Sequence, residues 1–389
     1  MLENKPEILN IRDTCTGCGA CMNICAHQAI SLKYDDEGFL MPFVDSTKCI
    51  HCGMCDKICH VIHPLNSNED KQTQYYMGWY KDDNVRESSS SGGAFTLLSE
   101  NILSKGGIVF ASRYNFDKER LEFSDTDHFP LREFRKSKYI ESNTQNVFRL
   151  VRENVRKGRD VLFCGTPCQV SAMRSFFHDK VPDNLLLVDF FCHGVPSNYN
   201  FTLYLHQFGE NHKITGLDFR YKNFSQGNCW HNLNMMFEID GKKKVVPYSY
   251  SSFLQAFLDN RLLRKCCYTC DLINRRLSDL TIADYWGIIY DDKTLDDNKG
   301  ISLFCLHTDK AKKVFSEIKE KSYVRTLTSD KLDYALKNRN QEEYSLNQRA
   351  LDVQYIENEG FLKFLDKNYG KQIMIRKIKD QIKWMLKRK

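Results

Sequence analysis

The stretch "CTGCGACMNIC" (residues 15–25) recurs farther along the chain as "CIHCGMCDKIC" (residues 49–59). Both copies space four cysteines as C-x2-C-x2-C-x3-C, so one tight loop supplies three thiolates and the fourth cysteine stands too far along to join them. In such repeats the fourth cysteine ligates the other cluster, and the pattern therefore predicts two [4Fe–4S] clusters. The expected ligands are Cys15, Cys18, Cys21 and Cys59 for one cluster, and Cys49, Cys52, Cys55 and Cys25 for the second.

Two zinc sites of four cysteines each are the alternative interpretation. Zinc ribbons separate two CxxC pairs by a longer loop and do not run three cysteines at two-residue gaps, so the spacing favours clusters. Gly19 and Gly53 occupy positions where the backbone has to pass close to a cluster. The proline that ferredoxins carry after the fourth cysteine is Ala26 in the first copy and His60 in the second, which removes no ligand.

Length and composition predict a folded protein with reduced thiols. The 389 residues are enough for two or three domains with a sizeable core. The first residues, "MLENKPEILNIRD", lack the apolar region of a signal peptide, and no apolar run reaches the ~18 residues of a membrane span. We therefore expect a cytoplasmic protein, in which cysteines bind metal rather than form disulfides.

Changes of pattern divide the chain into three regions. A polar, linker-like stretch at residues 63–74 separates a ferredoxin-type domain, residues 1–66, from a second domain, residues 75–290. Apolar runs such as "DVLFCGTPCQV" and "NLLLVDFFCHGVP" end in turn residues, which is typical of buried strands followed by functional loops. Residues 291–389 are expected to be mostly helical. The predicted fold class is α+β, with a ferredoxin-like 2[4Fe–4S] domain, a mixed α/β domain and a C-terminal helical tail.

Further cysteines follow the predicted strands of the second domain. Cys168 lies in "GTPCQ", Cys192 lies in "DFFCHG", and Cys267 and Cys270 form a CxxC pair. Four thiolates on loops at strand ends could converge on a third cluster. The competing interpretation, that these are small core side chains, has equal weight, because a lone CxxC is weak evidence. The remaining cysteines are predicted to be structural: Cys164, Cys229, Cys266 and Cys305.

A serine- and glycine-rich loop precedes a predicted amphipathic helix in "ESSSSGGAFTLLSENIL" (residues 87–103). Backbone N–H groups and hydroxyls at a helix N-terminus can bind phosphate. A plain helix cap is the more common reason for serine and glycine at this position. The loop alone therefore does not decide between the two.

Six motifs in sequence order resemble the coenzyme F420 hydrogenase/dehydrogenase beta-subunit family. They are the ferredoxin repeat, "SSSSGGAFT" (88–96), "SKYIES" (137–142), "LFCGTPCQV" (162–170), "CHGVPS" (192–197) and "CCYTC…RRLSDLTIADYWG" (266–287). The resemblance implies that the α/β domain binds FAD. It also implies electron transfer between iron–sulfur clusters and a two-electron acceptor, either coenzyme F420 or another organic substrate.

The resemblance also implies roles for individual residues. The flavin phosphates or ribityl chain would contact Ser90, Ser91, Gly92, Gly93 and Thr96. Ser137, Lys138 and Tyr139 would lie near the isoalloxazine, where a cation stabilises the anionic reduced ring. Cys168, Cys267 and Cys270 match cysteines of the family, and so support the third cluster.

Two functional hypotheses follow. The first is an iron–sulfur flavoenzyme that passes electrons between two clusters and an FAD-linked acceptor, with Lys138 and His193 as the candidate catalytic residues. Asp189 and Asp284 are further acid–base candidates, and a lone histidine such as His193 is more often a structural hydrogen-bonding group. The second hypothesis is an electron-transfer subunit that serves a partner enzyme and has no substrate site of its own. Both need a protein that donates or accepts electrons.

The C-terminal stretch "KQIMIRKIKDQIKWMLKRK" (residues 371–389) carries eight of the basic residues and one acid, Asp380. The rest of the chain is therefore close to neutral, and nothing in it predicts nucleic-acid binding. Apolar residues at helical spacing predict a basic amphipathic helix. Such a helix can contact an anionic membrane or an acidic partner, and its more common role is to pack on its own domain.

Overall fold

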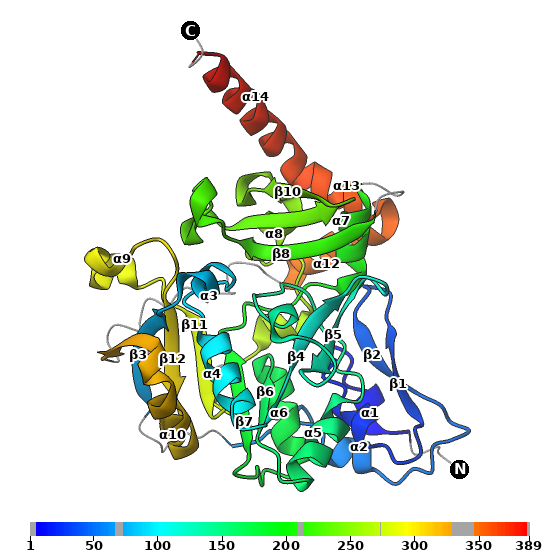
Figure 1. Cartoon of the computed structure of the whole chain (residues 1–389). Coiled ribbons are helices and arrows are strands. Elements are labelled where there is room, and N and C mark those ends of the chain that lie inside the picture. Colours follow the sequence, from blue (N-terminus) through cyan, green and yellow to red (C-terminus); the bar gives the residue numbers. More distant parts are fainter. Residues whose placement is uncertain (1–4, 67–72, 209–212, 273, 329–345, 387–389) are drawn as a thin grey trace.

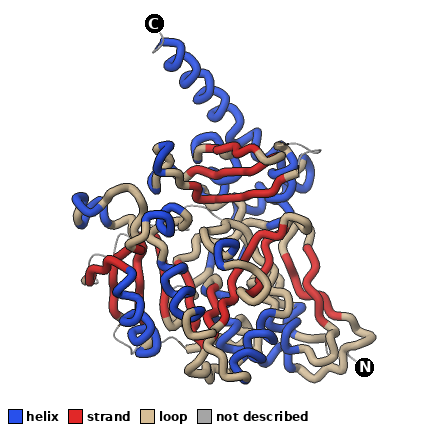
Figure 2. Tube along the Cα trace, viewed as in Figure 1, coloured by secondary structure: helices blue, strands red, loops and turns tan. Residues whose placement is uncertain are grey.

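The computed structural model describes residues 5–66, 73–208, 213–272, 274–328 and 346–386. A large twisted sheet with helices on both sides forms the body of the molecule (Figure 1). The N-terminal hairpin lies against one flank of this body, and a small second sheet covers one end of it. The last helix, α14, extends outward from that end, as Figure 2 also shows.

The central sheet has eight strands in the order β13-β3-β12-β11-β7-β6-β4-β5. Neighbours from β4 to β11 pair in parallel, and the strands at the two flanks pair antiparallel. The parallel strands are short apolar runs, as expected for strands that are buried on both faces. The bounds are β3 Gln74–Tyr80, β4 Ile108–Asn115, β5 Arg120–Asp125, β6 Val161–Cys164, β7 Leu185–Phe190, β11 Leu280–Asp284, β12 Ser302–Leu306 and β13 Ser322–Leu327.

Helices cover the two faces of this sheet. On one face α4 (Ala94–Leu103) and α10 (Asp309–Ile318) pack on Leu162 and Cys164, whereas on the other α5 (Val147–Arg156) and α6 (Pro167–Phe176) pack on Val161 and Phe163. The alternation along β6 follows from the two-residue period of a strand. The sheet therefore holds two separate apolar cores. Shorter helices lie at its ends: α3 Asp83–Glu87 and α9 Ile288–Asp291.

A three-stranded antiparallel sheet, ordered β10-β9-β8, forms a further layer. Its strands are β8 Ile214–Tyr221, β9 Asn234–Ile239 and β10 Lys242–Val246. A core rich in aromatic residues joins it to several helices: α7 Asn198–His206, α8 Ser252–Leu258 and α13 Phe361–Leu365. Helix α12 (Leu346–Glu359) precedes α13, and a π-helical turn at Asp366–Gly370 leads into α14 (Lys371–Leu386).

The N-terminal region consists of the hairpin β1 (Ile30–Tyr34) and β2 (Leu40–Val44) and two short helices, α1 (Ala20–Ile24) and α2 (Met54–Lys57). The predicted pair of strands is confirmed, and the mixed α/β architecture is confirmed in the same way. The central sheet, however, crosses the predicted boundary at residue 290. Strand β12 pairs with both β11 and β3, so residues 302–327 contribute two strands to the second domain rather than to a mostly helical region.

Candidate functional site

Four cysteines of the N-terminal region come together as the repeat predicts. We call Cys15, Cys18, Cys21 and Cys59 the first cysteine set. Burial raises the pKa of the Cys18 and Cys21 thiols, and the sulfurs of Cys15 and Cys59 raise both further. Gly19 lies between two of the ligands with a φ of 74°, and a Cβ there would stand 2.2 Å from Thr144 Oγ1. The close approach at this glycine is therefore to the second domain.

The second cysteine set is Cys25, Cys49, Cys52 and Cys55. Cys25 and Cys55 contact the same small apolar cluster around Ile8 and Ile30, while Cys52 is exposed. Gly53 starts α2 with a φ of 67°, as Gly19 starts α1, so the two copies of the repeat share a backbone conformation. Among the described residues, no three His, Cys, Asp or Glu side chains are close enough to bind a single metal ion. A cubic cluster needs a wider arrangement, because its four thiolates bind four different irons.

A third cysteine set is formed by residues that are far apart in the sequence. Burial raises the pKa of the Cys168 thiol, and the sulfurs of Cys192, Cys270 and Cys267 raise it further. Cys168 lies in the first turn of α6, where Thr166 caps the helix and contacts its sulfur at 3.0 Å. The sulfur of Cys168 also acts on Cys18 of the first set. The first and third sets are therefore neighbours across the domain boundary.

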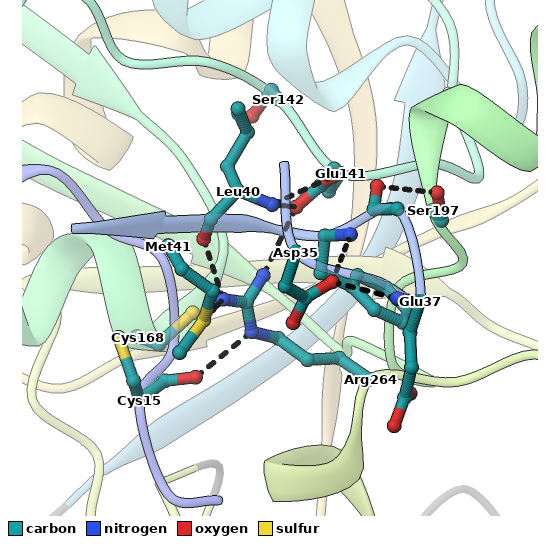
Figure 3. A network of polar contacts seen from close by, with 12 residues as sticks. Cys15, Asp35, Glu37, Leu40, Met41, Glu141, Ser142, Cys168, Ser197 and Arg264 are labelled. Carbon is teal, nitrogen blue, oxygen red and sulfur yellow. Dashed lines mark hydrogen bonds and ion pairs between the residues drawn. The ribbon is translucent and has the colours of Figure 1, made fainter. Parts of the chain in front are cut away.

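Arg264 connects these two sets (Figure 3). Its guanidinium donates to the Cys15 carbonyl at 2.8 Å, to the Leu40 carbonyl at 2.6 Å and to Glu141 at 3.0 Å. Glu141 in turn accepts from the Leu40 N–H at 3.2 Å. Burial raises the pKa of Glu141 to about 7, and Arg264 opposes this shift. The ion pair is almost fully buried, and it holds β2 and the first cysteine loop on the second domain.

A cavity of about 420 Å³ lies beside the third set. Its size is within the range of small-molecule and cofactor sites. Aromatic rings form much of its wall, and Cys192 is among the residues that line it. The charged residues of the wall are four cations and one carboxylate: Arg135, Lys136, Lys138, Arg220 and Asp284. The cavity is therefore suited to a ligand with an apolar, flat part and an anionic part.

Most of the predicted flavin-binding residues line this cavity. They are Ser90, Ser91, Gly93, Thr96, Ser137, Lys138 and Tyr139. The Ser137 N–H donates to Ser90 Oγ at 2.7 Å, so the serine loop and the "SKYIES" loop are joined at the wall. Gly92 is the exception: its N–H donates to Ser302 Oγ at 3.0 Å, and a Cβ would stand 2.6 Å from the Gly78 carbonyl oxygen. Gly92 thus serves the close contact between the loop and the sheet.

Lys138 has a well-defined set of partners. Its ammonium group donates to the carbonyls of Phe134, Arg135 and Lys136 at 3.1, 2.8 and 3.2 Å. These bonds use all three of its donors, and they fix the conformation of the loop at the cavity. Burial lowers the pKa of Lys138 to about 8, an effect that Asp218 opposes. The side chain can therefore act on a ligand through its charge, whereas its N–H groups are taken by the loop.

Three buried polar atoms of the cavity wall have no hydrogen-bond partner within the described part of the protein. They are Arg220 Nη2, Arg135 Nε and Thr96 Oγ1. Arg220 is 4% exposed, and its other amino group donates to Asp284 at 2.7 Å and to the Tyr139 hydroxyl at 3.1 Å. Burial opposes its charge, but Asp284 and Tyr139 outweigh this and raise the pKa of Arg220. A buried donor without a partner is costly, so a bound anionic group would satisfy it.

The acid–base candidates differ in position. His193 lines the cavity, and its Nε2 lies 3.2 Å from the carbonyl oxygen of Phe257, with the two rings in edge contact. This contact is the structural hydrogen bond that competes with a catalytic role for the histidine. Asp284 lies in the wall as the partner of Arg220. Asp189 accepts from Ser278 and Thr281 inside the sheet and is not among the lining residues.

Sequence reasoning missed the basic side of the cavity. Arg135 and Lys136 directly precede "SKYIES", and the run "RKSK" was a signal that could have been noticed. Arg220 on β8 had no such signal. Lys222, two residues on, donates to the carbonyls of Ser91 and Lys299 at 2.9 and 2.7 Å, and burial together with nearby cations lowers its pKa to about 7. It supports the serine loop from behind.

Comparison with known proteins agrees with this geometry. Residues 158–331 match the family model for the C terminus of the coenzyme F420 hydrogenase/dehydrogenase beta subunit. Residues 14–62 match the 4Fe-4S dicluster domain, a range that includes every cysteine of the first and second sets. The eight N-terminal cysteines therefore lie in a domain of the iron–sulfur class.

Individual relatives match different parts of the chain. The F-type subunit of the F(420)H(2) dehydrogenase of Methanosarcina mazei is 22% identical over 298 residues, which are 73% of this chain and 81% of that protein. The A-type subunit of the H(2):CoB-CoM heterodisulfide,ferredoxin reductase of Methanothermobacter thermautotrophicus is 36% identical over 92 residues, 20% of this chain and 14% of that protein.

A solved structure, the xenon-derivatised F420-reducing [NiFe] hydrogenase complex from Methanosarcina barkeri, is also similar. It aligns with a TM-score of 0.48 and 15% identity, over 73% of this chain and 92% of the matched chain. The family assignment rests on the two sequence models rather than on this structure. Through residues 158–331 the chain belongs to the coenzyme F420 hydrogenase/dehydrogenase beta-subunit family, and residues 14–62 are a 4Fe-4S dicluster domain.

Proposed function

We propose that this protein is an iron–sulfur flavoprotein oxidoreductase that passes electrons between the ferredoxin-type domain and an FAD in the cavity. The observation that carries the proposal is the position of the third cysteine set. Cys168 is next to Cys18 on one side, while Cys192 of the same set lines the cavity on the other. A [4Fe–4S] cluster on this set would join the dicluster domain to the cavity.

The cavity wall supports a flavin nucleotide as the ligand. The serine loop, the start of α4 and the unpartnered donors of Arg220 and Arg135 offer positions for a diphosphate. Lys138 and Tyr139 stand at the wall where a flat ring would be held, and the lysine charge would favour an anionic reduced ring. A flavin exchanges one or two electrons, which is the chemistry that one-electron clusters need in order to serve a two-electron substrate.

The electron partners are expected to be a protein on the cluster side and an organic two-electron acceptor or donor on the flavin side. The relatives from Methanosarcina mazei and Methanothermobacter thermautotrophicus are named as subunits of a dehydrogenase and of a reductase, which supports a protein partner. Coenzyme F420 is one candidate for the organic substrate, because the family is named for it. The alternative remains an electron-transfer subunit whose only partners are proteins.

Anaerobic purification of the full chain, with flavin and iron measured per protein, tests the proposal. We expect about one FAD, and Arg220→Met should lose most of it while the iron content stays the same. Arg113→Met is the matched control, because Arg113 is also buried but pairs with Glu133 outside the cavity. Clusters without flavin in the wild-type protein, or equal flavin loss in both variants, would overturn the flavin site and favour the electron-transfer subunit.

A further inference from the structure

Helix α14 is attached to the body by its first half only. Ile373 packs against the aromatic core under the small sheet, and Arg376 donates to the Ser249 carbonyl at 3.0 Å. Asp380 accepts a hydrogen bond from the Tyr250 hydroxyl. Beyond this point the helix extends away from the molecule (Figures 1 and 2). These three contacts define the side of the helix that faces the body.

The opposite side of α14 is apolar and exposed. At about 100° per residue, its apolar residues fall on one stripe that is turned away from Ile373, Arg376 and Asp380. The members of this stripe are between 41% and 60% exposed: Met374, Ile375, Ile378, Ile382 and Met385. No described residue covers them. A continuous apolar stripe on a surface helix marks an interaction site.

Cations border this stripe. Lys377, Lys379 and Lys383 are exposed along its edges, and the one acid of the helix, Asp380, is turned toward the body by its bond to Tyr250. Exposed lysines of β10 carry the same sign at this end of the molecule (Figure 1): Lys242, Lys243 and Lys244. The end of the molecule from which α14 extends is therefore positively charged.

We propose that α14 binds the surface of an anionic phospholipid bilayer, with its apolar stripe inserted between the head groups. An apolar stripe edged with lysines is the pattern of helices that lie in the membrane interface. A second copy of the chain fits less well, because the lysines that edge the two stripes would face each other. No helix in the described part of the chain is long and apolar enough to cross a membrane.

The test uses the full-length protein and vesicles of stated composition. We expect the protein to co-sediment with vesicles that contain phosphatidylglycerol, to bind pure phosphatidylcholine vesicles at least tenfold less, and to dissociate as salt is raised. Ile378→Glu/Ile382→Glu should abolish binding through the stripe. Lys377→Gln/Lys379→Gln/Lys383→Gln should weaken binding to the anionic vesicles only.

A matched control removes three exposed lysines elsewhere, in Lys118→Gln/Lys157→Gln/Lys313→Gln. This variant should bind like the wild-type protein, and all variants should keep the wild-type iron content. Equal binding to neutral vesicles, or equal loss in the control, would overturn the proposal. A dimer in light scattering that Ile378→Glu/Ile382→Glu dissociates, together with no vesicle binding, would assign the stripe to a second copy. Neither result depends on the flavin, so the two proposals can fail separately.

Discussion

Arg264 is a buried cation between two sets of cysteines, and its removal should be measurable in two ways. Arg264→Gln leaves Glu141 buried without its partner, a change that typically costs about 3–5 kcal/mol. It also removes a positive charge from the Cys15 loop, so the cluster of the first set should become harder to reduce. We expect a more negative midpoint potential in an anaerobic redox titration followed by electron paramagnetic resonance. Arg264→Lys, which keeps the charge, should recover much of the potential.

Arg349 provides a matched control for this prediction. It is also buried and also binds the N-terminal hairpin, through Glu37, but it stands beside Tyr268 rather than at the cysteines. Arg349→Gln should lower the free energy of unfolding and leave the cluster potentials unchanged. An equal shift in potential in both variants would mean that Arg264 acts only by holding the hairpin.

His307 should make the stability of the protein depend on pH. It is 1% exposed, and its ring nitrogens lie 2.8 Å from Thr281 Oγ1 and 3.2 Å from Thr73 Oγ1. Burial, together with the charge of Arg276, lowers its pKa to about 3 from the ordinary value of 6.5. Below pH 6.5 the unfolded chain takes up a proton that the folded chain excludes, so stability is lost as the pH falls toward 3.

Chemical denaturation at pH 7.5 and 5.5 measures this contribution. The wild-type protein should lose about 1 kcal/mol more of its unfolding free energy between these two values than His307→Gln does. The glutamine keeps a polar group near Thr281 but does not titrate. Parallel losses in the two proteins would show that other groups cause the acid sensitivity.

At the scale of elements, the serine loop depends on its contact with the central sheet. Gly92→Ala would place a methyl group 2.6 Å from the Gly78 carbonyl oxygen and 2.7 Å from the Ser302 nitrogen, both backbone atoms that cannot rotate away. We expect a loss of about 1–3 kcal/mol in unfolding free energy and weaker flavin retention. Gly241→Ala, where the added methyl meets open space, is the control, and it should retain flavin normally.

Local pattern was enough for some elements of this fold and not for others. The apolar runs that became β4 and β6, the spacing of α4 and the cysteine repeat are all properties of consecutive residues. The position of β12 is not, because its insertion between β11 and β3 is decided by pairing with distant strands. Arg220 belongs to the same class: it lies on β8, in another sheet, and reaches the cavity only through the packing of the two layers.

Over the whole molecule, the three cysteine sets and the cavity lie along one path. The dicluster domain is bound to the second domain by Arg264, by Thr144, which donates to the Cys18 carbonyl at 2.9 Å, and by Asn23, which donates to the Gln145 carbonyl at 2.7 Å. Such a fixed contact would keep the first and third sets at a constant separation. The surface around the exposed Cys52 is then the end of the path that a protein partner can approach.

The double variant Cys267→Ser/Cys270→Ser tests whether the third set is the middle of this path. Iron should fall from about twelve to about eight atoms per chain, because each cubic cluster carries four. The dicluster signals should stay, and chemical reductants should still reduce the flavin directly. Flavin reduction through a reduced ferredoxin should slow by more than tenfold, because the connection between the first set and the cavity is gone.

Cys305→Ser separates this effect from a general loss of structure. Cys305 is a fully buried cysteine of β12 in the core beneath Trp230 and Tyr285, apart from the three sets. Its replacement should lower stability while iron content and the ferredoxin-dependent rate per folded protein stay the same. If instead the double variant keeps twelve irons, or keeps the wild-type rate with eight, electrons reach the cavity by another route. The convergence of Cys168, Cys192, Cys267 and Cys270 would then be structural.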